Sequence, residues 1–174
     1  GMDTTSFMLD KVDVDILRHL QQDGRKSLTD IAEEMQVSVS TIRNRLKRLT
    51  DEGILHIIGW ADPVKTGFHA YARITIDVKP TSLIREVAEQ LSSIREVSFL
   101  AITSGPYDLE INLLCKDNAH LLEVMHQQIH TIKGVHATHT TLYFTVLKWA
   151  SHKVGDAQSS TGMESQTMTN RINA

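Results

Sequence analysis

Apolar residues recur at helical spacing in three short stretches near the start of the chain, which predicts three helices ending near Glu52. The stripes of the first two helices are Val12, Ile16, Leu17 and Leu20, then Leu28, Ile31, Ala32 and Met35. Gly24 is expected to end the first helix in a left-handed turn, and Ser27 is a suitable N-cap for the second. A third helix follows a turn at 36–37, which completes a helix-turn-helix pattern. Its core positions are Ile42, Leu46 and Leu49.

The third helix carries a dense set of cationic and polar side chains away from its apolar stripe. A basic helix face is most often only solvated, but as the third helix of such a frame it is typical of a helix that enters the major groove of DNA. Residues near the start of such a helix reach base edges, and Lys or Arg farther along meets phosphates. The candidates are Ser38, Ser40, Thr41 and Asn44 for bases or nearby phosphates, and Arg43, Lys47 and Arg48 for phosphates. Arg45 flanks the stripe, so it could join this DNA-binding surface or pair internally with an Asp or Glu.

From Phe68 onward the apolar period changes from helical to two, which is typical of half-buried strands. Alternation and turn residues predict strands at 68–78, 97–103, 109–115 and 137–148. Ser82 and Asn118 are expected to cap the helices that follow the first and third strands. The resulting order, β-α-β-β-α-β, is the ferredoxin-like arrangement, so the expected fold class is α+β.

These patterns divide the chain into four parts. Residues 1–60 form the helix-turn-helix domain, in which 54–60 could add a strand or small wing, and 61–67 form a linker containing Pro and Gly. Residues 68–152 form the ferredoxin-like domain. Residues 153–174 are a polar tail, which we expect to be flexible or weakly packed because it shows almost no apolar periodicity.

A ferredoxin-like sheet carries helices on one face only, so its other face must be polar or covered by a partner. Several apolar residues fall on the minority faces of the predicted strands. They are Tyr71, Leu100, Ile102, Leu114, Tyr143, Leu147 and Trp149. One exposed apolar residue carries little meaning, but several together indicate burial against the sheet of a second copy. The sequence therefore predicts a homodimer through this domain.

The charge of the chain restricts how it could bind DNA. The formal net charge is −3, and residues 1–60 contain eight Lys or Arg against ten Asp or Glu. DNA contacts must therefore come from charge placed locally, as on the third helix. The single cysteine, Cys115, excludes an internal disulfide and favours a cytoplasmic location. No apolar run is long enough to predict a membrane span.

No pattern of catalytic or metal-binding residues emerges from the sequence. His126 and His130 share a helix face, but no Cys pair or His-Glu-x-x-His spacing supports a zinc site. Cys115 shares a strand face with apolar residues, which favours a buried hydrophobe over a nucleophile. Phosphate-binding and dinucleotide-binding loops are lacking, as is Gly-x-Ser-x-Gly. We therefore expect a protein that is not an enzyme and that uses no metal or cofactor.

Three groups of motifs occur in order between Leu9 and Trp149. The first group is Leu9-Asp10, Asp13, Ile16-Leu17, Leu20, Asp23-Gly24-Arg25, Ser27, Ile31-Ala32, Ser38, Thr41-Ile42, Arg45, Leu49 and Gly53-Ile54. The second and third are Gly105-Pro106-Tyr107-Asp108 and Lys133-Gly134-Val135. Each motif alone is weak, but in this joint order the chain resembles the Lrp/AsnC, or feast/famine, family of transcriptional regulators.

The resemblance implies an N-terminal winged helix-turn-helix and a ferredoxin-like ligand-sensing domain that dimerises and assembles further, to a tetramer or an octameric ring. It implies double-stranded DNA as a partner and a small effector, usually an amino acid, bound where neighbouring dimers meet. The family's Gly-x-Tyr/Phe-Asp element falls on Gly105, Tyr107 and Asp108, and Thr138 and Thr140 are the effector candidates from an adjacent subunit. The simpler alternative is that Asp108 only closes its turn.

Two positions depart from the family pattern. Lys133 stands where the family usually has Pro, and Pro106 where it often has a polar residue, which leaves the effector open. Some proteins that resemble this family are sirohaem decarboxylases, so an enzyme of that kind, or a ligand-binding module on the same fold, is the alternative function. The basic third helix and the Gly-x-Tyr-Asp element favour the regulator.

Overall fold

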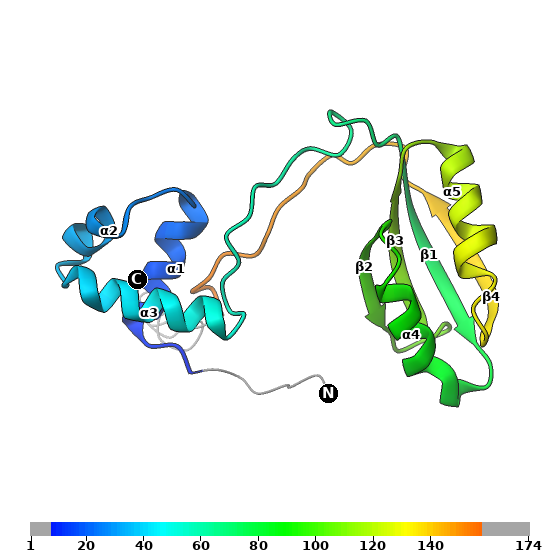
Figure 1. The fold of residues 1–174 in the computed structure, drawn as a ribbon, viewed down its shortest axis with the longest axis horizontal. Helices are drawn as coiled ribbons and strands as arrows, with labels where there is room; N and C mark the ends of the chain where they lie inside the picture. The colour runs from blue at the N-terminus through cyan, green and yellow to red at the C-terminus, as the bar shows by residue number, and fades with distance from the viewer. Residues whose placement is uncertain (1–7, 158–174) are drawn as a thin grey trace, which may run out of the picture. The chain divides into compact units, whose positions relative to one another are not determined.

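The computed structural model describes residues 8–157, and these form two compact units. One unit contains the described residues up to Gly59 together with those from Ala150 onward, and the other is Trp60–Trp149. Figure 1 shows the first as a group of three helices and the second as a sheet with its own helices. No helix within residues 8–157 is long and apolar enough to cross a membrane.

Three helices build the first, helical unit. They are α1 (Lys11–Gln22), α2 (Leu28–Met35) and α3 (Val39–Asp51). Each begins after a side chain that accepts a hydrogen bond from a backbone N–H three residues later, and these N-caps are Asp10, Ser27 and Ser38. The apolar stripes meet in one core, whose fully buried members include Ile16, Ile31, Ile42 and Leu49. The three predicted helices and the predicted cap at Ser27 are confirmed.

Two local predictions for the helical unit are wrong. Gly24 is not left-handed, and α1 ends at Asp23 in an extended conformation. Gln36, with φ 57°, is left-handed instead and ends α2. Residues 54–60 contain no strand, because Ile54 and Leu55 pack against the helical core instead of forming a ladder.

The second unit contains an antiparallel sheet with the strand order β2-β3-β1-β4. The strands are β1 (Ala70–Val78), β2 (Val97–Ile102), β3 (Leu109–Cys115) and β4 (Val135–Leu142). A 3-10 turn, η1 (Thr81–Leu83), leads into α4 (Ile84–Ser92), and α5 (Asn118–Val124) continues into a π-helical turn, η2 (Met125–Ile129). This order confirms the ferredoxin-like prediction. The helix starts differ from it, since Pro80 precedes η1 and Asp117, not Asn118, caps α5.

One face of the sheet is buried against α4, α5 and η2. Its core includes Ile74, Ile76, Leu109, Ile111, Val87, Leu91 and Ile129, all fully buried. Alternate residues of each strand lie on the opposite, open face, because successive side chains of a strand point to opposite sides. The open face carries Tyr71, Arg73, Phe99, Glu110, Asn112 and Tyr143.

Two residues of β2 that were predicted on the open face lie on the other face of the sheet. Leu100 and Ile102 pair with buried residues of β3, so both lie on the helix-covered face. An irregularity in the register after Val97 shifts the alternation and places Phe99 on the open face instead. A period-two pattern does not reveal such a bulge, so the prediction for Leu100 and Ile102 is wrong.

Residues 150–157 group with the helical unit although they follow the sheet in sequence. Val154 packs against the helical core, and Gly155 is buried. The start of the stretch expected to be a weakly packed tail therefore folds onto the helices. The remainder of that stretch, residues 158–174, lies outside the described residues.

Candidate nucleic-acid interface and effector site

The start of α3 presents a group of hydroxyls. Ser38 Oγ accepts from the N–H of Thr41 at 3.1 Å and lies 2.7 Å from Thr41 Oγ1 and 3.1 Å from Ser40 Oγ. Ser38 and Ser40 are exposed, as is Asn44 one turn farther along. Hydroxyl and amide groups near the start of a helix can contact base edges or phosphates. The structure brings these four sequence candidates together on one exposed end of α3.

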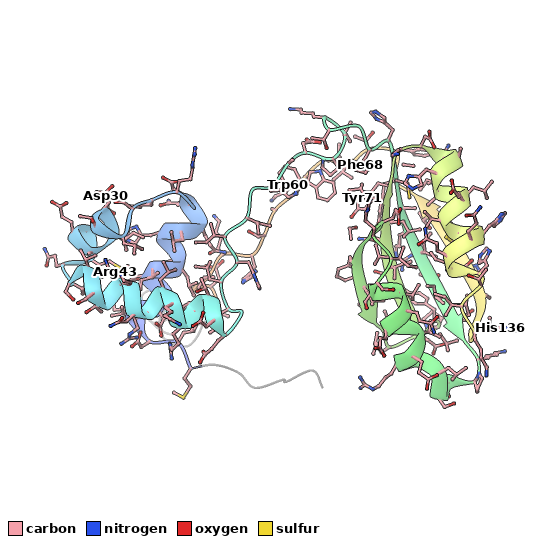
Figure 2. All side chains as sticks on the ribbon, in the orientation of Figure 1. Asp30, Arg43, Trp60, Phe68, Tyr71 and His136 are labelled. Carbon is pink, nitrogen blue, oxygen red and sulfur yellow. The ribbon has the colours of Figure 1, made fainter. Side chains whose placement is uncertain are left out.

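Two cations on α3 remain directed to solvent. Arg43 is exposed, and none of the ion pairs among residues 8–157 involves it (Figure 2). Lys47 is 75% exposed and pairs only with Asp51, one turn along the same helix. The Asp51 carboxylate raises the pKa of Lys47, so this ammonium stays charged. An exposed pair of this kind is weak and can be exchanged for a phosphate.

The other two basic candidates on α3 turn toward α1. Arg48 Nη2 donates to Asp13 at 2.7 Å, and Arg45 donates to Asp13 at 3.2 Å and to Asp10 at 2.5 Å. Asp13 is 1% exposed, which makes it the most buried charged residue of the helical unit within the described range. Arg45 therefore takes the internal pairing that the sequence left open, and Arg48 is engaged with the same carboxylate.

Asp10 and Asp13 form a capping box at the start of α1. The N–H of Asp13 donates to Asp10 at 2.9 Å, and the N–H of Asp10 donates back to Asp13 at 3.2 Å. The hydrogen bond from the Asp13 N–H, followed by that from Arg45, holds the pKa of Asp10 below its ordinary value. Sequence reasoning missed this cluster, although two Asp residues three apart before an apolar run are a signal for it.

The turn between β2 and β3 is closed by the predicted effector motif. Gly105 has φ 113°, a conformation that glycine adopts without strain. Asp108 Oδ2 accepts from the N–H of Val78 at 2.8 Å, and the N–H of Asp108 donates to the carbonyl of Ile76 at 3.1 Å. Asp108 therefore ties the turn to the end of β1, and the remaining lone pairs of its carboxylate are available to another donor.

Tyr107 lies in a polar network on the open face of the sheet. Its hydroxyl donates to Glu110 at 3.1 Å, Arg73 Nε donates to the same carboxylate at 2.8 Å, and Arg73 Nη2 also contacts the Tyr107 hydroxyl. The Arg73 guanidinium lies 5.4 Å from the centroid of the Tyr107 ring. The hydrogen bond to Glu110 raises the pKa of Arg73, so the guanidinium stays charged and is paired with the Glu110 carboxylate.

The two threonine candidates lie on the edge strand β4. Thr138 pairs with Ile76 and Thr140 with Ile74, which places both on the side that the helices cover. Thr138 Oγ1 lies 3.1 Å from Nε2 of His130, and Thr140 is exposed. Asp108 and Thr138 therefore approach β1 from its two neighbouring strands. No hydrogen bond between them is found among residues 8–157.

The histidine pair and the cysteine were considered for other chemistry. The rings of His126 and His130 lie 5.6 Å apart, and residues 8–157 contain no cluster of three or more His, Cys, Asp or Glu that could hold a metal ion. Cys115 is fully buried, and this burial raises its pKa to about 11. The thiol is thus a packing group of the sheet core.

Comparison with known proteins matches both units. A family model for a winged helix-turn-helix DNA-binding domain matches residues 9–56, and a model for the Lrp/AsnC ligand-binding domain matches residues 69–150. An uncharacterized HTH-type transcriptional regulator of Pyrococcus furiosus is 36% identical over 148 residues, which covers 84% of this chain and 99% of the relative. The chain belongs to the Lrp/AsnC family of transcriptional regulators. The HTH-type transcriptional regulator Ptr1 of Methanocaldococcus jannaschii is 34% identical, covering 81% of this chain and 95% of Ptr1.

Solved structures of Lrp/AsnC proteins share the fold. Escherichia coli AsnC superposes with a TM-score of 0.77 at 24% identity, covering 84% of this chain and 99% of AsnC. A transcriptional regulator of Neisseria meningitidis, solved as a complex with L-Met, superposes with a TM-score of 0.70 at 25% identity, covering 84% of this chain and 94% of that one. The family and its relatives indicate a DNA-binding transcriptional regulator with a ligand-binding domain.

Proposed function

We propose that this Lrp/AsnC regulator binds operator DNA in the cytoplasm as a homodimer, and that a small effector, an amino acid, modulates that binding. The observation that supports DNA recognition is the exposed end of α3, where hydroxyls and an amide lie beside the solvent-directed Arg43 and Lys47. Such a helix enters the major groove, and a dimer presents two of them to half-sites one helical turn or a multiple of it apart.

The charge of the protein implies a DNA interface with few phosphate contacts. The chain carries a net charge of −3, and two of the four basic residues on α3 pair with Asp13. Each DNA-binding unit therefore supplies only a small number of free cations. We propose that dimers and higher assemblies, to a tetramer or octamer, strengthen binding by presenting several units to one DNA molecule.

The open face of the sheet supports the proposed dimer. Tyr71 stacks with Trp149 at a centroid distance of 5.4 Å and contacts Tyr143 at 4.8 Å, and Trp60 contacts Trp149 at 5.7 Å. Phe99, on the same face, is 48% exposed. Aromatic side chains on a sheet face without a covering helix are stabilised when a second copy buries them.

The proposed dimer leads to two expectations: a mass of two chains in solution, and a substitution that abolishes dimerisation. At micromolar concentration, light scattering should give at least 39 kDa, twice the 19.5 kDa of one chain. Phe99→Glu should reduce the mass to that of a monomer, because each copy would then bury a charge without a partner. Leu122→Glu, at a residue of α5 that is 56% exposed, is the control and should still dimerise. A monomeric wild-type protein would contradict the proposal.

An amino-acid effector fits the chemistry of the turn at Gly105–Asp108. The Asp108 carboxylate can accept a charge-assisted hydrogen bond from an α-ammonium group while still accepting from the N–H of Val78. Backbone N–H groups of a glycine-containing turn can receive the α-carboxylate. The proposed second wall, Thr138 and Thr140, would come from an adjacent subunit. The L-Met complex of the Neisseria meningitidis regulator shows that one structurally similar protein binds an amino acid.

A thermal-shift screen with the twenty amino acids tests the effector. The ligand should raise the melting temperature, because it binds only the folded state. Asp108→Asn should weaken this ligand about tenfold, since replacing a charge-assisted hydrogen bond with a neutral one costs about 1.5 kcal/mol. The ligand-free melting temperature should change little, because the Asn oxygen can still accept from Val78. No shift with any amino acid would exclude an amino-acid effector, and an undiminished shift in Asp108→Asn would remove Asp108 from the site.

A further inference from the structure

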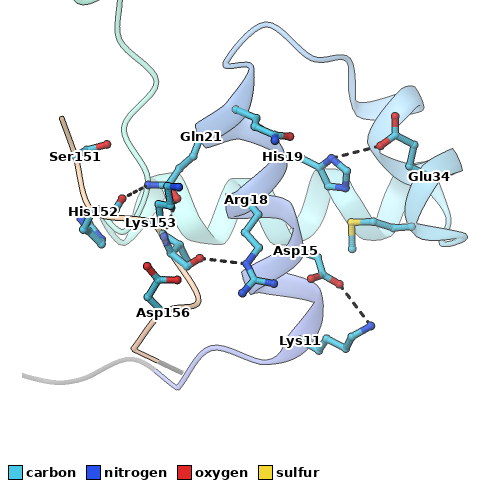
Figure 3. A pocket seen from close by; sticks show the side chains of 13 residues that line it. Lys11, Asp15, Arg18, His19, Gln21, Glu34, Ser151, His152, Lys153 and Asp156 are labelled. Carbon is cyan, nitrogen blue, oxygen red and sulfur yellow. Dashed lines mark hydrogen bonds and ion pairs between the residues drawn. The ribbon is translucent and has the colours of Figure 1, made fainter. Parts of the chain in front are cut away.

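Residues 151–156 run along the outer side of α1, and we call them the C-terminal strap (Figure 3). Gln21 binds the strap with both ends of its amide, since Nε2 donates to the carbonyl of His152 at 2.9 Å and Oε1 accepts from the N–H of Val154 at 2.8 Å. Arg18 Nε donates to the carbonyl of Val154 at 3.1 Å. Two side chains of α1 thus satisfy three backbone groups of the strap, as a neighbouring strand would.

Packing gives the strap one defined register on α1. Val154 contacts the core of the helical unit, and the next residue, Gly155, is buried with φ 99°. A Cβ at Gly155 would lie 2.2 Å from Nη2 of Arg18. Only glycine combines this backbone conformation with so close a contact. The sequence of the strap therefore favours this one position on α1.

The strap is attached partly through solvent-exposed groups. A hollow of about 790 Å³ opens between it and α1, lined by polar and charged side chains that include Lys11, Asp15 and His19 (Figure 3). Three of the hydrogen bonds that hold the strap come from Gln21 and Arg18, which are exposed side chains of α1. Few buried apolar contacts and exposed hydrogen bonds characterise segments that open locally without global unfolding. The strap can therefore detach while the three-helix core stays folded.

The strap gives the helical unit a second covalent connection to the sheet unit. The chain leaves the helical unit after Gly59 and returns to it at Ala150. The returning stretch continues from β4, the strand that carries Thr138 and Thr140. A unit held by one linker samples many orientations, and a second anchored connection removes part of that freedom.

We infer that the docked strap restricts the orientation of each helical unit and thereby raises affinity for DNA that carries two half-sites. This inference rests on the proposed function, because it requires a dimer that binds DNA through α3. Once one α3 is bound, a restricted partner unit has a higher effective concentration at the second half-site. Releasing the strap lowers affinity for paired half-sites. Affinity for a single half-site stays the same, because no residue of the exposed α3 surface changes.

Amide exchange tests docking without DNA. In Gln21→Ala, which removes two of the three hydrogen bonds, exchange of the Val154 N–H should accelerate at least tenfold over the wild-type chain. The matched control is Gln22→Ala, at the neighbouring exposed residue of α1, and it should exchange as the wild type does. Gly155→Ala is a second variant that displaces Arg18 from the strap side and should act like Gln21→Ala. Unchanged exchange in both variants would overturn the docking.

DNA binding tests the consequence. The probes are duplexes that the wild-type protein enriches from a random pool, carrying either one half-site or two half-sites one helical turn apart. In Gln21→Ala and Gly155→Ala, the Kd for the paired duplex should rise about five- to tenfold and that for the single half-site less than twofold. Equal changes on both duplexes, or no change on either, would overturn the inference. Failure of the wild-type protein to enrich any duplex would instead refute the proposed function, while amide exchange still reports on docking.

Discussion

Replacing Asp13 with Ala should lower the free energy of unfolding of the helical unit by about 2–3 kcal/mol. Asp13 is 1% exposed and accepts hydrogen bonds from Arg45, Arg48 and the backbone N–H of Asp10. Its removal leaves two guanidinium groups without their shared partner and opens one half of the capping box. The loss is below the largest values known for broken buried pairs, because both arginines are partly exposed and can turn to water.

Two spectroscopic signals separate the units in this experiment. Both tryptophans, Trp60 and Trp149, belong to the sheet unit, so their fluorescence follows its unfolding. Circular dichroism at 222 nm follows mainly the helices. Asp13→Ala should shift the helical transition in urea and leave the fluorescence transition in place. Asp15→Ala is the matched control on α1, since within residues 8–157 Asp15 pairs only with the exposed Lys11, and an exposed pair contributes at most about 1 kcal/mol. Equal shifts in both variants would show that the buried cluster is not a main support of the unit.

The spacing of apolar residues predicted the fold well, because every helix and strand buries one face and that burial requires a regular spacing. The stripe Ile42, Leu46 and Leu49 placed α3 correctly, and the strand patterns gave the order β-α-β-β-α-β. The structure departs from the prediction where one residue changes the local backbone conformation or strand register. One bulge after Val97 moved Leu100 to the helix-covered face, and no propensity distinguishes that strand from a regular one.

The candidate site was less predictable because its partners are distant in sequence. Arg48 lies on the basic side of α3, and only folding brings it to Asp13, 35 positions away. Val154 is an isolated apolar residue in a polar stretch, so its docking depends on side chains of α1 that no local pattern reveals. Asp108 was predicted to bind the effector, and its hydrogen bond to the N–H of Val78 also fits a purely structural role in the turn. Sequence motifs thus identify such residues. Tertiary contacts then decide whether each one supports the fold or can bind DNA or an effector.

This division changes which residues should be altered to test DNA binding. Substituting Arg48 would break its bond to the buried Asp13, so lost binding could reflect an unfolded helical unit. Arg43 has no ion pair among residues 8–157, and Lys47 pairs only with the exposed Asp51. Changing these two residues removes charge from the exposed surface of α3 while the core contacts of the unit remain.

The double variant Arg43→Glu/Lys47→Glu should bind DNA at least about a hundredfold more weakly at low salt. Two lost charge-assisted hydrogen bonds to phosphate, at about 1.5 kcal/mol each, account for about 3 kcal/mol, and the introduced carboxylates add repulsion. The slope of log K against log salt should fall by about two, because two fewer counterions are released. Fluorescence anisotropy with a labelled duplex over a range of salt concentrations measures both quantities.

Two controls separate phosphate contact from a general change in charge. Lys65→Glu places the same kind of reversal on an exposed residue outside the DNA-binding unit and should leave DNA affinity within about twofold, because Lys65 makes none of the proposed phosphate contacts. Asp51→Ala frees Lys47 from its intrahelical partner and should keep or slightly raise affinity. If the double variant kept wild-type affinity and salt slope while its circular dichroism was unchanged, α3 would not be the surface that meets the phosphates. DNA recognition would then have to be sought on another face of the helical unit.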